Sequence, residues 1–118
     1  MGQSKPPRPT AIVVEDDEIL REMLTLLLEE SKFEVIQCED AETASLAIKV
    51  RHPSLLITDI NLTGNVDGVE LAHLARQFYP DMRVLVISGT PPMTALPDGV
   101  KFLSKPIYPA ALLREAMH

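Results

Sequence analysis

The stretch Leu55-Leu56-Ile57-Thr58-Asp59 decides how the rest of the chain is interpreted, and Ile60-Asn61-Leu62-Thr63-Gly64 follows it. A short apolar run bounded by turn residues is typical of a strand buried on both faces of a sheet. This strand ends at Asp59, and open parallel sheets bind their ligands just beyond the carboxyl ends of the strands. The sequence therefore makes Asp59 the first candidate for a functional residue.

The composition indicates a single globular domain. The chain has 118 residues, of which 46% are hydrophobic, enough for one core. Its formal net charge of −6 argues against direct nucleic-acid binding, because such surfaces are usually basic. No apolar run has membrane-spanning length and the N-terminal residues lack the apolar core of a signal peptide, so we expect no membrane association and a cytoplasmic location. The single cysteine, Cys38, is predicted to be an inert buried thiol.

The chain is predicted to divide into a leader and one folded domain. Residues 1–9 are polar and rich in proline, which predicts a disordered leader, and residues 10–118 form the domain. The sequence stops at His118 without a second domain. We therefore expect either a stand-alone domain or a piece of a longer protein.

Strand-like and helix-like segments alternate along the domain. Apolar runs predict strands at residues 11–14, 33–38, 55–59, 83–87 and 100–103. Helical spacing of apolar residues begins at Glu18, after Asp40, after Asp67 and near Pro109. This alternation predicts an α/β fold, a flavodoxin-like doubly wound sheet of five parallel strands in the order 2-1-3-4-5. In that order the first strand lies beside the third, so their carboxyl ends meet.

Polar residues stand at the ends of four predicted strands; they are Glu15 and Asp16, Asp59, Ser88, and Lys105. Three carboxylates brought close together repel one another unless a cation intervenes. Hard carboxylate oxygens suit Mg²⁺, whereas zinc would call for His or Cys at a matching spacing, which this sequence lacks. The sequence therefore predicts a magnesium site at this edge of the sheet.

A carboxylate beside a metal ion, with a lysine and a hydroxyl nearby, is suited to phosphoryl transfer. We assign Asp59 as the phosphoryl acceptor. Asp16 would bind Mg²⁺ directly, Glu15 would hold metal-bound water, and the backbone carbonyl of Asn61 would add a further ligand. The protein is predicted not to be a dedicated enzyme; it would catalyse only its own phosphorylation and autodephosphorylation.

From Ala11 to Met117 the chain resembles the receiver domain of two-component response regulators. The matching motifs, in order, are Val13-Val14-Glu15-Asp16-Asp17, Thr58-Asp59-Ile60-Asn61-Leu62, Asp67-Gly68, Ile87-Ser88-Gly89 and Phe102-Leu103-Ser104-Lys105-Pro106. Each motif alone is a weak signal, but all five in this order are highly specific.

The resemblance implies that Asp59 takes its phosphoryl group from a histidine kinase or phosphotransfer protein, and that a downstream effector, not identified by the sequence, responds. It implies that Ser88 senses the phosphoryl group, that Lys105 pairs with it, and that the Lys105–Pro106 bond is cis. By the same likeness Asn61 and Thr90 tune dephosphorylation. Phe102 is either an aromatic switch that rotates on activation or a static core residue.

Two segments depart from the family pattern. The loop from Asp59 to Asp67 is one residue longer than usual, and we expect Gly64-Asn65 to absorb the extra residue. The segment of residues 90–99 is short and carries three prolines, so the family's fourth helix is predicted to be shortened or missing, with at most one helical turn. Met93 and Leu96 would then cover the sheet or form an exposed contact patch.

The residues are also compatible with two other functions, a phosphatase and an adaptor. Asp59-Ile60-Asn61-Leu62-Thr63 approaches the Asp-x-Asp-x-Thr motif of haloacid dehalogenase-like phosphatases, although Asn61 replaces the second acid. Alternatively, the chain is an adaptor that keeps the receiver fold and binds a partner without phosphorylation, through its proline-rich segment.

Overall fold

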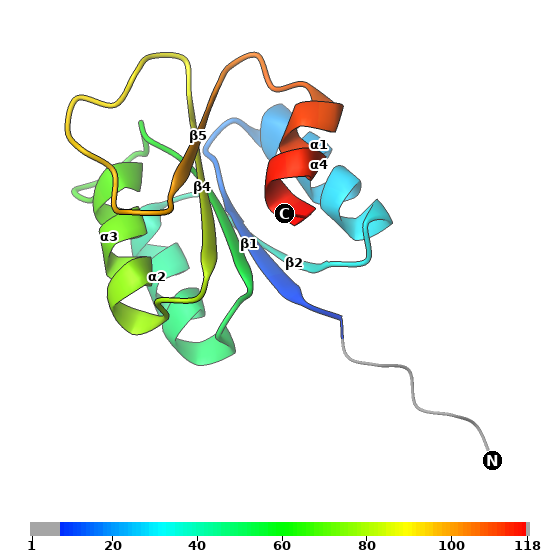
Figure 1. The fold of residues 1–118 in the computed structure, drawn as a ribbon, viewed down its shortest axis with the longest axis horizontal. Helices are drawn as coiled ribbons and strands as arrows, with labels where there is room; N and C mark the ends of the chain where they lie inside the picture. The colour runs from blue at the N-terminus through cyan, green and yellow to red at the C-terminus, as the bar shows by residue number, and fades with distance from the viewer. Residues whose placement is uncertain (1–7, 118) are drawn as a thin grey trace.

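A five-stranded parallel sheet flanked by four helices forms the described part of the chain, residues 8–117 of a computed structural model (Figure 1). The strands are β1 (Thr10–Val14), β2 (Glu34–Cys38), β3 (Leu55–Asp59), β4 (Arg83–Ser88) and β5 (Lys101–Ser104). The helices are α1 (Glu18–Glu30), α2 (Ala41–Arg51), α3 (Gly68–Phe78) and α4 (Pro109–Met117). Of the predicted leader, residues 1–7 lie outside the described residues. Among residues 8–117, no helix is long and apolar enough to cross a membrane.

The strand order is β2-β1-β3-β4-β5, which confirms the predicted doubly wound arrangement. β3 lies at the centre of the sheet, and all five of its residues are buried. Val14 at the end of β1 pairs with Thr58, and Asp59 pairs with Ile87 of β4. The carboxyl ends of β1, β3 and β4 therefore lie side by side at one edge of the sheet.

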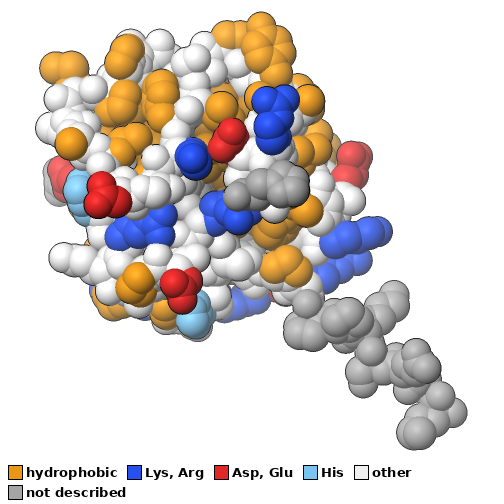
Figure 2. Space-filling view, in the orientation of Figure 1, with side chains coloured by type: hydrophobic (Ala, Val, Ile, Leu, Met, Phe, Trp, Pro, Cys, Tyr) orange, Lys and Arg blue, Asp and Glu red, His pale blue; other side chains and the backbone are white. Residues whose placement is uncertain are grey.

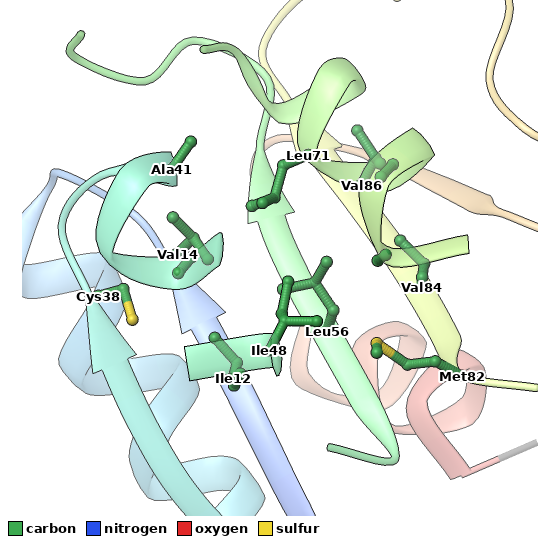
Figure 3. Close-up of a cluster of buried hydrophobic side chains, with 13 residues drawn as sticks. Ile12, Val14, Cys38, Ala41, Ile48, Leu56, Leu71, Met82, Val84 and Val86 are labelled. Atoms are coloured by element: carbon green, nitrogen blue, oxygen red, sulfur yellow. The ribbon is translucent and has the colours of Figure 1, made fainter. Parts of the chain in front are cut away.

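Helices cover both faces of the sheet: α2 and α3 lie on one face, and α1 and α4 on the other (Figure 1). Successive strand residues point to opposite faces, so neighbours such as Ile12 and Val13 belong to different cores. Figure 3 shows the core beneath α2 and α3, where Ile48 and Leu71 meet residues of β1, β3 and β4. Burial on both faces explains why the strands are continuous apolar runs.

Aspartates cap the N-termini of the first three helices. Asp17 accepts hydrogen bonds from the amides of Ile19 and Leu20, and Asp40 accepts one from Thr43. Asp67 accepts one from the amide of Glu70 at 2.9 Å. These side chains pair amides that would otherwise lack partners in the first helical turn, which explains why the helices begin where they do.

No helix forms between β4 and β5, as the three prolines predict. Residues 89–100 instead run as an irregular segment on the α3 side of the sheet (Figure 1). Leu96 packs against the core under α2 and α3, whereas Met93 is 97% exposed. Figure 2 shows hydrophobic side chains gathered at the top of the view, where Figure 1 places this segment and, across the sheet, the start of α4. One of the two residues expected to cover the sheet therefore does so.

The last residue of α3, Phe78, lies outside the buried stripe of that helix. It is 43% exposed, and the ammonium of Lys49 lies 5.2 Å from the centre of its ring. The helix ends at Phe78, and the next residue, Tyr79, packs against the core in its place.

Candidate functional site

Three carboxylates meet where β1 and β3 end. Glu15 and Asp16 directly follow β1, and Asp59 is the last residue of β3. Because the two strands are paired, oxygens of these three side chains lie within 4.8 Å of one another. Glu15 and Asp59 are buried and Asp16 is exposed, so the cluster opens to solvent on one side.

Lys105 supplies the positive charge in this cluster. It directly follows β5, and the Lys105–Pro106 peptide bond is cis, as expected. Its Nζ lies 2.9 Å from Oδ2 of Asp59 and 3.0 Å from Oε1 of Glu15. Partial burial alone would lower the pKa of Lys105, but the bonds to Asp59 and Glu15 outweigh it and raise the pKa. The amine is therefore held as an ammonium between two carboxylates.

Glu15 is unusually enclosed for a carboxylate, with 1% of its surface exposed. One oxygen accepts the amide of Asp17 at 3.1 Å, and the other accepts Lys105. Burial raises the pKa of Glu15, and the charge of Asp59 adds to the effect, although the bonds from Asp17 and Lys105 lower it in part. An ionised Glu15 therefore lowers the stability of the folded chain.

Arg21 of α1 lies directly behind Glu15. Its guanidinium donates a hydrogen bond to the backbone carbonyl of Glu15 at 2.7 Å and another to Gln37 Oε1 at 3.2 Å. The side chain is largely buried, and Glu39 at 3.7 Å is its nearest acid. These contacts fix the backbone from which the Glu15 and Asp16 side chains project.

Asp59 is held by the loop that follows it and by the start of α3. Its Oδ1 accepts the amide of Asn61 at 3.2 Å, while Oδ2 accepts Lys105. The amide of Gly68 donates to the carbonyl of Ile60, and a Cβ at Gly68 would lie 1.9 Å from the carbonyl oxygen of Asp59. Only glycine lets α3 begin this close to the end of β3.

Ser88 lies at the end of β4, one residue beyond Ile87, the strand partner of Asp59. The side chain is fully buried, and its Oγ accepts the amide of Thr90 at 3.2 Å. The backbone carbonyl of Ser88 accepts the amide of Lys105 at 2.8 Å, which ties β4 to the residue after β5. The Ser88 hydroxyl, the Lys105 ammonium and the Asp59 carboxylate therefore lie at the ends of adjoining strands.

The donor set of this site fits Mg²⁺. Three carboxylates offer hard oxygen ligands, the exposed side of Asp16 leaves room for water, and no His or Cys belongs to the cluster. The carboxylates also outnumber the one ammonium among them, so a further cation is electrostatically favoured.

Comparisons with known proteins identify the family. A sequence profile described as the response regulator receiver domain matches residues 11–117. Over 109 residues the chain is 31% identical to the response regulator receiver protein CpdR of Brucella abortus (strain 2308), which covers 88% of this chain and 90% of CpdR. The chain belongs to the response regulator receiver family.

Solved structures agree with the receiver assignment. A response regulator receiver protein from Sinorhizobium medicae WSM419 superposes with a TM-score of 0.86 at 25% identity, covering 93% of this chain and 92% of that one. A response regulator protein from Burkholderia pseudomallei, crystallised with a phosphorylated aspartic acid, a calcium ion and citrate, gives a TM-score of 0.80 at 25% identity. That match covers 92% of this chain and 66% of the other. The receiver spans only 17% to 48% of the length of seven further curated relatives.

The structure brings together most of the site residues predicted from the sequence. Glu15, Asp16, Asp59 and Lys105 form one cluster, and the amide of Asn61 contacts Asp59. Their assigned roles in the receiver remain predictions.

Two other predicted residues of the receiver lie farther from the carboxylates. Thr90 is exposed, and its amide donates a hydrogen bond to Ser88 Oγ at 3.2 Å. Phe102 is half-buried against the core beneath α2 and α3 and pairs along the sheet with Val86. The switch role of Phe102 stays a prediction.

Two residues that contact the receiver's site, Arg21 and Thr63, were not predicted from the sequence. Arg21 could have been recognised, because it lies on the buried stripe of α1 with Leu24 and Leu28, and a charged residue on such a stripe needs a partner. Thr63, whose hydroxyl lies 3.4 Å from Oδ2 of Asp16, carried no such signal, because its position depends on the conformation of the loop. In that loop Gly64 adopts a φ of +107°, consistent with its expected role in absorbing the extra residue.

Proposed function

We propose that this receiver is a phosphorylation-activated signalling switch in which Asp59 accepts a phosphoryl group from a histidine kinase or a phosphotransfer protein. The observation that carries the proposal is the cluster of three carboxylates within 4.8 Å, with the Lys105 ammonium 2.9 Å from Asp59. The phosphorylated aspartic acid in the Burkholderia pseudomallei relative supports the same chemistry here. Family membership favours this function over the phosphatase interpretation.

The proposed transfer places an oxygen of Asp59 on the phosphorus atom of a phosphohistidine. The new O–P bond replaces the P–N bond, and the imidazole of the donor leaves with the electron pair. Lys105 would neutralise charge on the phosphoryl oxygens, and the Ser88 hydroxyl would donate a hydrogen bond to one of them. Glu15, Asp16 and Asp59 would hold Mg²⁺, which, when bound, would supply further positive charge for the transfer.

Phosphorylation of Asp59 would start the signal, and hydrolysis would end it. The acyl phosphate on Asp59 would bias a two-state equilibrium that an effector protein reads. Water would then release the phosphoryl group, with Asn61 and Thr90 setting the rate. The receiver would thus be no dedicated enzyme, and its place would be the cytoplasm, as the sequence suggests.

Phosphorylation by acetyl phosphate tests the proposal without knowledge of the kinase. Intact-mass spectrometry should detect one added phosphoryl group in the presence of Mg²⁺ and none after chelation. Asp59→Asn should abolish the addition and Asp16→Asn should reduce it.

Asp17→Asn is the matched control, because Asp17 belongs to the same acidic run but caps α1, and asparagine caps a helix equally well. This variant should be phosphorylated like the wild type. An absence of phosphoryl transfer under these conditions, or transfer that survives Asp59→Asn, would refute the proposed function.

A further inference from the structure

The outward face of α2 carries two large aliphatic side chains that nothing in the described chain covers. Leu46 is 65% exposed and Val50 is 78% exposed. They stand four residues apart, so they lie one above the other on the same side of the helix. The inward residues Ala41, Ala44 and Ile48 already bury the opposite side against the sheet. α2 is therefore apolar on both sides, unlike an ordinary surface helix.

The charges along α2 change sign from one end to the other. Glu39, Asp40 and Glu42 lie at or before its first turn, while Lys49 and Arg51 lie in its last turn. Glu42 and Lys49 are seven residues apart, so they share one flank of the Leu46–Val50 stripe. Among residues 8–117, neither forms an ion pair, although the ammonium of Lys49 lies 5.2 Å from the centre of the Phe78 ring. Arg51 pairs with Glu34 at 2.7 Å.

We propose that this face binds a second copy of the chain, with the two α2 helices packed antiparallel about a two-fold axis. When Leu46 of one copy packs against Val50 of the other, the symmetry repeats the contact, as in any isologous interface. Residues on the same flank of antiparallel helices face each other. Glu42 of each copy then lies beside Lys49 of the other.

The same pattern disfavours a parallel arrangement of two copies. Parallel α2 helices in register would bring the two acidic ends together and the two basic ends together, and would align the helix dipoles. The antiparallel pair instead places each negative end against a positive one. The α2 surface is therefore complementary to itself, which favours a second copy of the chain as its binding partner.

The proposed dimer is weak. One pair of short helices buries less than the roughly 1,200–2,000 Å² of a stable interface, and the net charge of −6 on each copy opposes association. We therefore expect a dissociation constant on the order of 0.1 mM. The interface does not include Asp59, so its presence or absence is independent of the proposed phosphorylation.

Sedimentation velocity over a concentration series tests this interface. The wild-type chain should shift from monomer towards dimer as its concentration approaches the millimolar range, and Leu46→Glu should stay monomeric. Leu26→Glu is the matched control, because Leu26 on α1 is 61% exposed and lies outside the interface. A wild-type chain that stays monomeric would overturn the proposal and leave the α2 face to a partner of another kind, and a dimer that survives Leu46→Glu would also overturn it.

A charge exchange tests the orientation. Glu42→Lys and Lys49→Glu should each weaken the dimer about tenfold or more, because each variant places like charges together twice per dimer. The double variant Glu42→Lys/Lys49→Glu should recover most of the wild-type association. If the double variant is as weak as the single ones, the antiparallel register is wrong.

Discussion

Glu15 is a residue whose place in the candidate site reduces the stability of the fold. Its carboxylate is buried beside Asp59, and its pKa is raised above the ordinary value of 4.5. The folded state therefore holds this proton to a higher pH than the unfolded state. Stability falls as pH rises from the unfolded pKa through the raised folded pKa, and the loss is complete above it.

Replacing Glu15 with Gln should therefore stabilise the protein at about pH 7, because the amide keeps the shape and avoids the buried charge. The difference in free energy of unfolding between the variant and the wild type should be smaller at about pH 4, where Glu15 is mostly protonated in both the folded and the unfolded state. Urea unfolding at the two pH values measures both effects. A variant less stable than the wild type at neutral pH would contradict this account of Glu15.

Arg21 is a residue whose removal should be destabilising. Arg21→Met leaves the buried carbonyl of Glu15 without its donor at 2.7 Å, and an unpaired buried group costs about 1–3 kcal/mol. Arg51→Met is the comparison, since the ion pair of Arg51 with Glu34 is exposed and is worth less than about 1 kcal/mol. Chemical denaturation of both variants gives the two free energies, and equal losses would mean that Arg21 does not support the site backbone.

At the scale of elements, the contact between α3 and the end of β3 depends on Gly68. A Cβ there would lie 1.9 Å from the Asp59 carbonyl oxygen, so Gly68→Ala should cost more than about 2 kcal/mol by displacing α3. Gly89→Ala is the control, because a Cβ at Gly89 meets nothing within 4 Å. Thermal unfolding distinguishes the two, and a Gly68→Ala variant as stable as Gly89→Ala would show that α3 does not require the glycine.

The segment between β4 and β5 should open far more readily than the helix beside it. Among residues 8–117, no hydrogen bond is formed by the amides of Met93, Thr94, Ala95 and Leu96, whereas the amides within α3 are paired along the helix. Amide hydrogen exchange should be nearly unprotected at these four residues and strongly slowed in α3. Protection of residues 93–96 comparable to α3 would indicate a helix that the three prolines were expected to exclude.

The elements could be predicted where one local signal dominated. Buried strands were predictable from continuous apolar runs, helix starts from the aspartates at positions 40 and 67, and the missing helix from its prolines. Arg21 was overlooked because its role depends on a carbonyl that only the folded chain brings near.

At the scale of the whole molecule, the site follows from strand order. Placing β1 beside β3 joins residues separated by more than 40 positions, so the carboxylate cluster was predictable once the order 2-1-3-4-5 was adopted. The distances were not predictable. That Lys105 bonds both Glu15 and Asp59, and that Thr63 reaches Asp16, depends on loop conformations that no local pattern encodes.

A titration with Mg²⁺, followed by amide chemical shifts in a nitrogen-15 NMR spectrum, tests the central claim most directly. The account predicts saturable shifts confined to the strand ends, at Asp16, Asp17, Asn61 and the residues beside Lys105, and their loss in Asp16→Asn. Saturable binding elsewhere on the chain, or no binding at millimolar Mg²⁺, would contradict the claim that these carboxylates form one magnesium-dependent phosphoryl site.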